Sequence, residues 1–96
     1  MTKDEVIVTL RRHKDSLACF QINSLFLFGS IARDEGADNS DIDILVEFTN
    51  APTFDLYMDL KFFLEDLFGR VVDLVTVTGI RKEIKDHIQK DLIRVA

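Results

Sequence analysis

A strongly apolar stretch that ends in a glycine is the main constraint on how this 96-residue chain can fold. Residues 24–28 read Ser-Leu-Phe-Leu-Phe, and Gly29 stops the run. A short continuous apolar run bounded by a glycine is typical of a β-strand buried on both faces. A second strand is predicted over 41–48, where Ile42 and every second residue after it form an apolar face. The polar loop between the two runs is turn-rich from Gly36 to Ser40, and it joins the strands by only about a dozen residues.

Three helices are predicted around this pair of strands. The first spans about residues 3–17, because Thr2 and Glu5 match a capping box and apolar residues recur at helical spacing. The second begins after the N-cap Thr53 and is closed by Gly69. The third covers about 80–90. The second helix carries a broad apolar stripe that is expected to be core: Phe54, Tyr57, Leu60, Phe63, Leu64, Leu67 and Phe68.

A third strand is predicted over 71–77, and residues 92–96 suit a short extended tail. No repeat, low-complexity tract or linker interrupts the chain. The pattern therefore predicts a single domain, residues 1–96, of the α/β (α+β) class, in which helices pack on a small mixed β-sheet.

Charge and composition narrow the function classes. Twelve Lys and Arg against seventeen Asp and Glu give a net charge of −5, which argues against a protein that grips nucleic acid through its phosphates. The same balance suits carboxylates gathered around a divalent cation, although ordinary acidic solubility also explains it. No leader or membrane-spanning run is present, so a cytoplasmic location without membrane contact is expected. The single Cys19 has apolar neighbours and is expected to be a small buried residue.

Two carboxylates on the second strand are the first candidate site residues. Asp41 and Asp43 are two residues apart, so their side chains point the same way with Cα atoms roughly 6.5–7 Å apart. Such a pair repels unless a cation lies between them, which makes a divalent metal the natural partner. The alternative is that Asp-x-Asp simply opens an exposed strand.

Asp73 adds a third carboxylate, because it interrupts an otherwise apolar strand. A charge buried there is costly unless it is paired or bound to a metal. Next to Asp41 and Asp43 it would complete a metal site and could accept a proton from an attacking hydroxyl. The alternative is an edge-strand aspartate that faces water.

Gly29 and Ser30 suggest a phosphate contact after the first strand. A glycine lets another backbone approach closely, exposed N–H groups at a helix start favour an anion, and a serine hydroxyl can donate to a phosphate oxygen. The alternative is that Ser30 merely caps a helical turn over 30–34. Arg33 could reach the same phosphates, or could pair with Asp34 or Glu35 on the surface.

Taken together, three motifs resemble the nucleotidyltransferase superfamily of DNA polymerase beta type. They are Gly-Ser-x-Ala-Arg from Gly29, Ser-Asp-Ile-Asp-Ile-Leu-Val-Glu-Phe from Ser40, and Val-Asp-Leu-Val-Thr from Val72. More narrowly, the chain resembles the minimal nucleotidyltransferases (MNT proteins) of prokaryotes over nearly its whole length. It departs from them at Asp34, where family members often have glycine.

The resemblance implies a polymerase-beta-like nucleotidyltransferase fold and a metal-dependent transfer of AMP from ATP. By this likeness Gly29, Ser30, Arg33 and Ser40 would bind the nucleotide. Asp41, Asp43 and Asp73 would be the catalytic carboxylates and would ligate Mg²⁺, with two ions expected.

The resemblance also implies a partner. MNT proteins often pair with a helical HEPN toxin in a hetero-oligomeric complex and act as its antitoxin by adenylylating a tyrosine. The short chain leaves little room for a substrate-binding domain, so the acceptor is expected to be brought by another protein. Two alternatives stay open: an antitoxin that works by stoichiometric binding with a weak or inactive site, and nucleotide transfer to a small molecule.

Overall fold

The chain forms one mixed sheet with helices against it. The structure, a computed structural model, describes residues 2–35, 41–77 and 92–95. The predicted helix at 80–90 and Ser40 lie outside these described residues. The elements in chain order are α1 (Lys3–Arg12), α2 (Lys14–Leu17), the 3-10 turn η1 (Ala18–Phe20), β1 (Ile22–Phe28), α3 (Gly29–Ala32), β2 (Ile42–Phe48), α4 (Phe54–Phe68), β3 (Val72–Thr76) and β4 (Ile93–Arg94).

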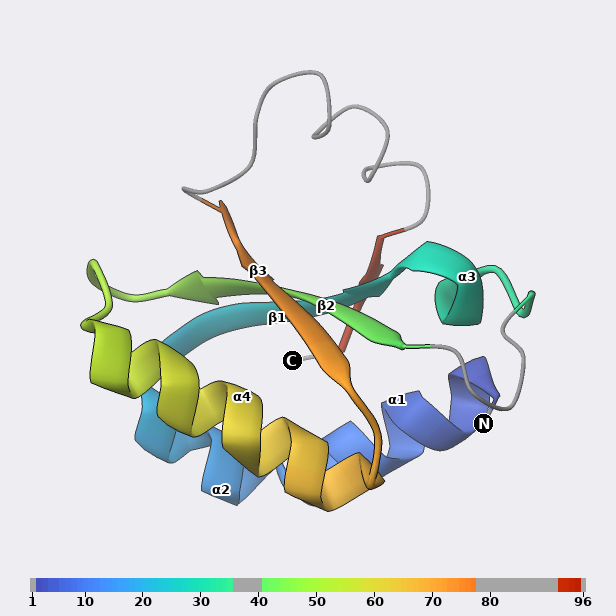
Figure 1. The fold of residues 1–96 in the computed structure, drawn as a ribbon, viewed down its shortest axis with the longest axis horizontal. Coiled ribbons are helices and arrows are strands. Elements are labelled where there is room, and N and C mark those ends of the chain that lie inside the picture. The colour runs from blue at the N-terminus through green and yellow to red at the C-terminus, as the bar shows by residue number, and fades with distance from the viewer. Residues whose placement is uncertain (1, 36–40, 78–91, 96) are drawn as a thin grey trace.

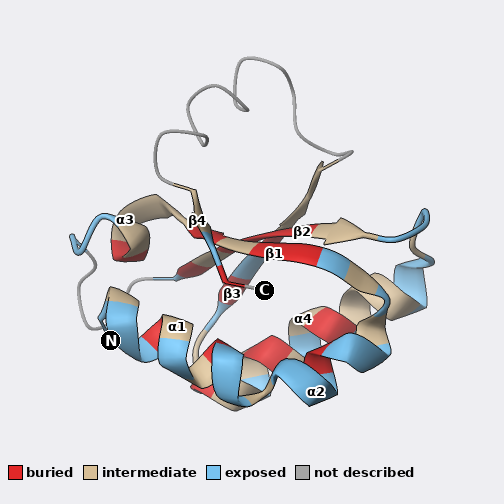
Figure 2. Cartoon of the chain, turned by 180° about the vertical axis from the view of Figure 1, so that it is seen from behind, coloured by how far each residue is buried: buried red, intermediate tan, exposed pale blue. Residues whose placement is uncertain are grey.

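The sheet contains both kinds of strand pairing, as predicted. Its order is β3-β2-β1-β4; β1 runs antiparallel to β2 and β4, whereas β2 and β3 are parallel. The predicted short tail is the two-residue strand β4. Helices α1, α2 and α4 lie on one side of the sheet in both views, and α3 follows directly from the end of β1 (Figure 1, Figure 2).

The core lies between the sheet and these helices. On β2, Ile42, Ile44 and Val46 are fully buried, and Leu60 and Leu64 of α4 are equally inaccessible. These residues follow the alternation of a strand and the 3.6-residue period of a helix, which places each set on one face. Figure 2 shows the buried residues on the facing surfaces of sheet and helices.

Both predicted helix starts are confirmed. The Thr2 hydroxyl accepts from Glu5 N–H while the Glu5 carboxylate accepts from Thr2 N–H, which is a complete capping box. The Thr53 hydroxyl accepts from Leu56 N–H, and Gly69 ends α4 in the left-handed conformation at φ 63°. These contacts fix where α4 begins and where the chain turns toward β3.

The first helix is broken where the sequence predicts continuity over 3–17. α1 ends at Arg12, and His13 separates it from α2. The His13 Nδ1 atom lies 2.9 Å from the Thr9 carbonyl oxygen, and the His13 N–H bonds the Leu10 carbonyl instead. The imidazole therefore occupies the acceptor that the backbone would use in a continuous helix.

Two burial predictions are wrong. Cys19 is exposed, because it lies on the turn η1 that leads from the helices to β1. Phe54 is 76% exposed, because it is the first residue of α4 and lies ahead of the turns that pack on the sheet. In the described part of the chain, no helix is both long and apolar enough to cross a membrane.

Candidate functional site

Asp43 and Asp73 are direct neighbours in the sheet. They are register partners in the parallel pairing of β2 with β3, so their side chains lie on the same face. Asp41 precedes β2 by one residue and is exposed. On the other side of β2, Asp43 pairs with Phe28, the last residue of β1. The fold therefore brings the three predicted carboxylates to one end of β2 and β3.

Gly29 lies against the carboxylate of Asp43. A Cβ atom at Gly29 would meet Asp43 Oδ2 at 2.0 Å and Cγ at 2.8 Å, and the backbone has a φ of +79°. Real Cβ atoms essentially never approach so closely, and L-residues rarely adopt that φ. Only glycine fits here, so the Gly-Ser motif and the Asp-x-Asp motif form one site.

The pKa of Asp43 is raised from 3.8 to about 6. Burial is the largest cause, followed by the negative charges of Asp73 and Asp41, while the positive charge of Arg33 acts in the opposite direction. Burial and neighbouring negative charges disfavour the ionised carboxylate, whereas a nearby positive charge favours it. The site therefore concentrates negative charge that a bound cation would relieve.

Ser30 does not cap a helix, contrary to one of the two readings of the sequence. α3 begins at Gly29, its N-cap is Phe28, and no side chain makes a capping hydrogen bond there. Ser30 therefore lies inside the first turn, directly after the glycine that touches Asp43. This placement is compatible with the predicted phosphate contact.

Arg33 and Asp34 make different contacts at the end of α3. Arg33 Nε lies 3.0 Å from Glu35 Oε2, which confirms the surface pairing that the sequence allowed, although its charge still reaches Asp43. Asp34 has a φ of 56° and lies 3.7 Å from Lys3 Nζ. A backbone position with positive φ favours glycine, which is the residue that the family resemblance leads us to expect at the position of Asp34.

The carboxylates suit a hard divalent cation by their chemistry. Mg²⁺ prefers oxygen ligands and is usually bound by one or two carboxylates together with substrate phosphates. Asp43 carries the raised pKa that such a cation would reverse. Within the described residues, however, no three His, Cys, Asp or Glu side chains form a ready-made metal cluster. The remaining ligands would then come from the nucleotide and water.

The family can now be assigned. The nucleotidyltransferase domain model matches residues 10–95, which include all the strands of the sheet and the helices α2, α3 and α4. The chain belongs to the nucleotidyltransferase family. Its mixed sheet with helices against it agrees with the fold that the resemblance implies. Transfer of a nucleotidyl group is accordingly the activity of this enzyme class.

Relatives cover the chain from end to end. A Methanocaldococcus jannaschii protein named as a protein adenylyltransferase is 43% identical over 98 residues, covering 98% of each chain. The protein adenylyltransferase MntA of Thermococcus cleftensis is 32% identical over 96 residues, covering 99% of this nucleotidyltransferase and 97% of its own length.

Solved structures agree with the fold. A minimal nucleotidyltransferase superposes with a TM-score of 0.83 at 28% identity, covering 97% of this chain and 95% of its own. A complex of a tri-AMPylated HEPN toxin with its MNT antitoxin from Shewanella oneidensis contains a chain that superposes with a TM-score of 0.63. That chain is 16% identical, and the match covers 88% of this nucleotidyltransferase and 70% of that chain.

One polar group near this site was not singled out from the sequence. Glu47 lies on the same face of β2 as Asp43, and it accepts hydrogen bonds from Asn23 and Ser24. The alternation of β2 places Glu47 on this face, but the contact with β1 depends on strand register. Sequence spacing alone does not specify that register.

Proposed function

We propose that this nucleotidyltransferase transfers AMP from ATP to a tyrosine hydroxyl of a HEPN-type toxin and thereby acts as its antitoxin. The observation that carries the proposal is the pairing of Asp43 with Asp73 beside Gly29. This arrangement places the proposed phosphate contact at Gly29 directly beside a pair of carboxylates.

The residues divide the work of an in-line displacement. The backbone at Gly29 and the hydroxyl of Ser30 bind the triphosphate, with Arg33 and Ser40 as further nucleotide contacts. Asp41, Asp43 and Asp73 would hold Mg²⁺, with two ions expected. When bound, the cation supplies charge neutralisation on the phosphates and alignment of the reacting oxygens.

The bond changes balance without any further reagent. The acceptor oxygen forms a bond to the α-phosphorus, and the bond from that phosphorus to the pyrophosphate oxygen breaks. The hydroxyl proton passes to a carboxylate, for which Asp73 is the candidate.

A protein acceptor is supported by the relatives. Full-length homologues carry the name protein adenylyltransferase, and a solved neighbour of the same fold is an antitoxin bound to an AMPylated HEPN toxin. At 96 residues the chain matches nearly the whole length of these homologues, so the comparison does not depend on an additional domain.

Intact-mass analysis of the toxin tests this function. The purified nucleotidyltransferase is incubated with the HEPN-type protein that co-purifies with it, ATP and Mg²⁺. We expect a mass increase of one or more AMP groups on the toxin, localised to tyrosine by peptide sequencing. Omission of Mg²⁺ or substitution Asp43→Asn should remove it. An unmodified toxin in the presence of folded enzyme and bound partner would refute the proposal.

A stoichiometric antitoxin is the second candidate. The observation in its favour is that the described carboxylates do not form a ready-made metal cluster. Toxin neutralisation by the double variant Asp41→Ala, Asp43→Ala separates the two. If this variant, produced at the wild-type level, still neutralises the toxin, binding suffices and transfer is dispensable.

A further inference from the structure

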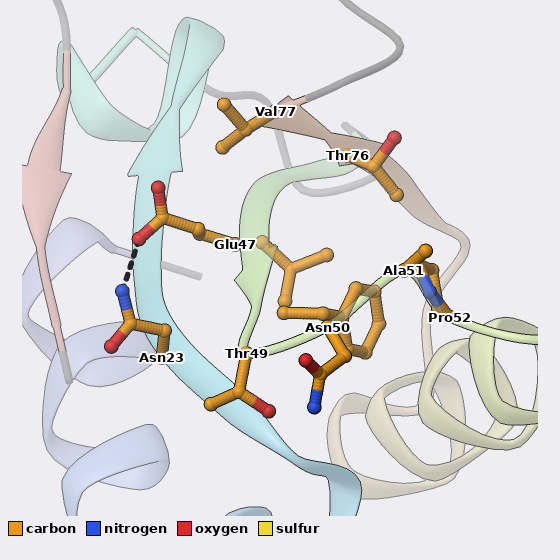
Figure 3. A pocket seen from close by; sticks show the side chains of 10 residues that line it. Asn23, Glu47, Thr49, Asn50, Ala51, Pro52, Thr76 and Val77 are labelled. Atoms are coloured by element: carbon orange, nitrogen blue, oxygen red, sulfur yellow. Dashed lines mark hydrogen bonds between the residues drawn. The ribbon is translucent and has the colours of Figure 1, made fainter.

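A pocket of about 560 Å³ opens at the far end of the strands that carry the aspartates. This volume is within the range of ligand-binding clefts. Figure 3 shows Asn23 and Glu47 on one side, with Thr76 and Val77 across from them. The complete lining is Asn23, Val46, Glu47, Phe48, Thr49, Asn50, Ala51, Pro52, Thr76 and Val77.

A β-bulge fixes the position of Glu47 in this pocket. The register of β1 against β2 shifts between Ile22 and Ser24, so Asn23 is the extra residue. Both Asn23 and Ser24 donate to the same oxygen, Oε1 of Glu47, with 3.3 Å from the Ser24 hydroxyl. A bulge re-aims side chains that would otherwise point to opposite faces. Two neighbouring donors therefore hold one carboxylate.

Glu47 supplies the charge of the pocket. Among the described residues that line the pocket, Glu47 is the sole ionisable one. Both of its hydrogen bonds to described residues fall on Oε1. Of the two donors, Ser24 is 5% exposed and therefore buried, whereas Asn23 is exposed. A fixed carboxylate of this kind favours a cationic hydrogen-bond donor.

The pocket is aligned with the catalytic aspartates. Glu47 follows Asp43 by four residues on the same face of β2, a separation of about 13 Å along the strand. In an in-line displacement the acceptor and the leaving pyrophosphate lie on opposite sides of the phosphorus. Gly29 follows Phe28, the register partner of Asp43, so Gly29 and the pocket lie on opposite sides of Asp43 along β2. With the triphosphate at Gly29, the pocket is on the side of Asp43 that is left for the acceptor.

We propose that this pocket binds a lysine or arginine side chain of the acceptor protein. The proposal rests on the proposed protein-adenylyltransferase function and specifies how that acceptor is recognised. A cationic group complements the fixed carboxylate of Glu47 and the acidic face that it shares with Asp43. An extended acceptor segment places such a residue about four positions from the modified tyrosine.

Binding is tested without catalysis, by backbone-amide NMR of the full chain. The probes are N-acetyl-arginine methylamide, its neutral isostere N-acetyl-citrulline methylamide, and adenosine. We expect the arginine probe to shift the signals of Glu47, Thr49 and Thr76, and the citrulline probe to leave them unchanged. Substitution Glu47→Gln should remove the shifts, whereas Asp66→Asn, the same loss of charge at an exposed position of α4, should retain them.

Two results would overturn the proposal. Equal shifts with the arginine and citrulline probes would show that charge is not recognised. Shifts with adenosine and none with arginine would assign the pocket to the nucleobase. Because the citrulline comparison uses wild-type protein, the conclusion does not depend on the folding of the Glu47 variant.

Transfer to peptides gives the second readout. Two tyrosine peptides are compared that carry lysine or glutamine four residues from the tyrosine. The lysine peptide should have about a tenfold lower KM at similar kcat, an advantage that is lost in Glu47→Gln and kept in Asp66→Asn. Equal KM values overturn the proposal. If neither peptide nor toxin is modified, the proposed function has failed, and the NMR comparison decides the pocket by itself.

Discussion

Asp43 on β2 and Asp73 on β3 are partners across parallel strands, with the Gly29 backbone against the far side of Asp43. Two like charges are held at adjacent positions of a sheet although mutual repulsion and burial both oppose it. Such an arrangement is costly for the isolated protein and is resolved when a cation binds. We therefore predict that the candidate site lowers the stability of the unliganded chain and raises its affinity for a metal–nucleotide complex.

Removing either carboxylate should separate catalysis from folding. We expect Asp43→Asn and Asp73→Asn each to reduce AMP transfer by about a hundredfold or more, because each removes an anionic metal ligand and Asp73→Asn also removes the proposed proton acceptor. Neither should unfold the chain, since asparagine is nearly isosteric. Mass spectrometry of the acceptor and circular dichroism of the enzyme measure the two effects. Asp66→Asn, on the exposed surface of α4, serves as the matched control.

The raised pKa of Asp43 predicts that the cation-free chain loses stability as pH rises. The folded state binds the proton more tightly than the unfolded state, so the carboxyl is neutral in both states below 3.8 and ionised in both above about 6. Between these values stability falls. After allowance for solvent screening, we expect Asp43→Asn to gain about 1–2 kcal/mol relative to wild type between pH 4 and pH 7.

Urea denaturation in EDTA at both pH values measures this difference. Taking variant minus wild type cancels the contribution of the other titrating groups. A constant difference across the pH range would contradict the raised pKa.

A bound divalent cation should reverse the loss of stability that the ionised Asp43 causes. At pH 7 we expect excess Mg²⁺ to raise the melting temperature of the wild-type chain relative to EDTA, because a ligand that binds only the folded state stabilises it. The double variant Asp43→Asn, Asp73→Asn should show no such increase. Differential scanning fluorimetry measures both, and an equal response of wild type and variant would place Mg²⁺ binding elsewhere.

Much of the site follows from strand periodicity. The alternation of Ile42, Asp43 and Ile44 already places the carboxylate on the face opposite the core, and the structure confirms it. The glycine requirement at Gly29 also follows from the sequence as a close approach. That Asp43 is the group approached depends on the register between β1 and β2, which local patterns do not encode.

The exceptions have local physical causes. The break at His13 arises because an imidazole competes for the Thr9 carbonyl, a contact that hydrophobic periodicity does not register. Likewise, Phe54 continues the apolar stripe of α4 but lies at its first position. The bulge at Asn23 that orients Glu47 is a property of strand pairing. Each of these three differences concerns how helices and strands end or pair. The helices and strands themselves are predictable from local residue spacing.

Asp34, the departure from the family pattern, is predicted to be neutral for catalysis. Its side chain pairs with Lys3 at the start of α1 and does not contribute to the pKa of Asp43. We expect Asp34→Gly to change transfer by less than about twofold and stability by about 0.5 kcal/mol or less. The lost surface ion pair is offset by relief of the positive φ. A marked change in the KM for ATP would show that Asp34 acts at the site after all.

Alanine variants of Gly29 and Gly69 separate two effects of replacing a glycine: collision of the new Cβ atom with a neighbour, and strain of a left-handed backbone. Both have positive φ, +79° and +63°, but a Cβ at Gly29 would collide with Asp43, whereas one at Gly69 would meet nothing within 4 Å. Both alanine variants should lose about 1–2 kcal/mol of stability from the left-handed conformation, and Gly29→Ala should lose more because of the collision with Asp43. Only Gly29→Ala should lose transfer, by about a hundredfold, because the Asp43 carboxylate must move. Chemical denaturation and AMP incorporation into the acceptor measure the two effects. Comparable activity of the two variants at equal stability would show that the Gly29–Asp43 contact is not required for transfer.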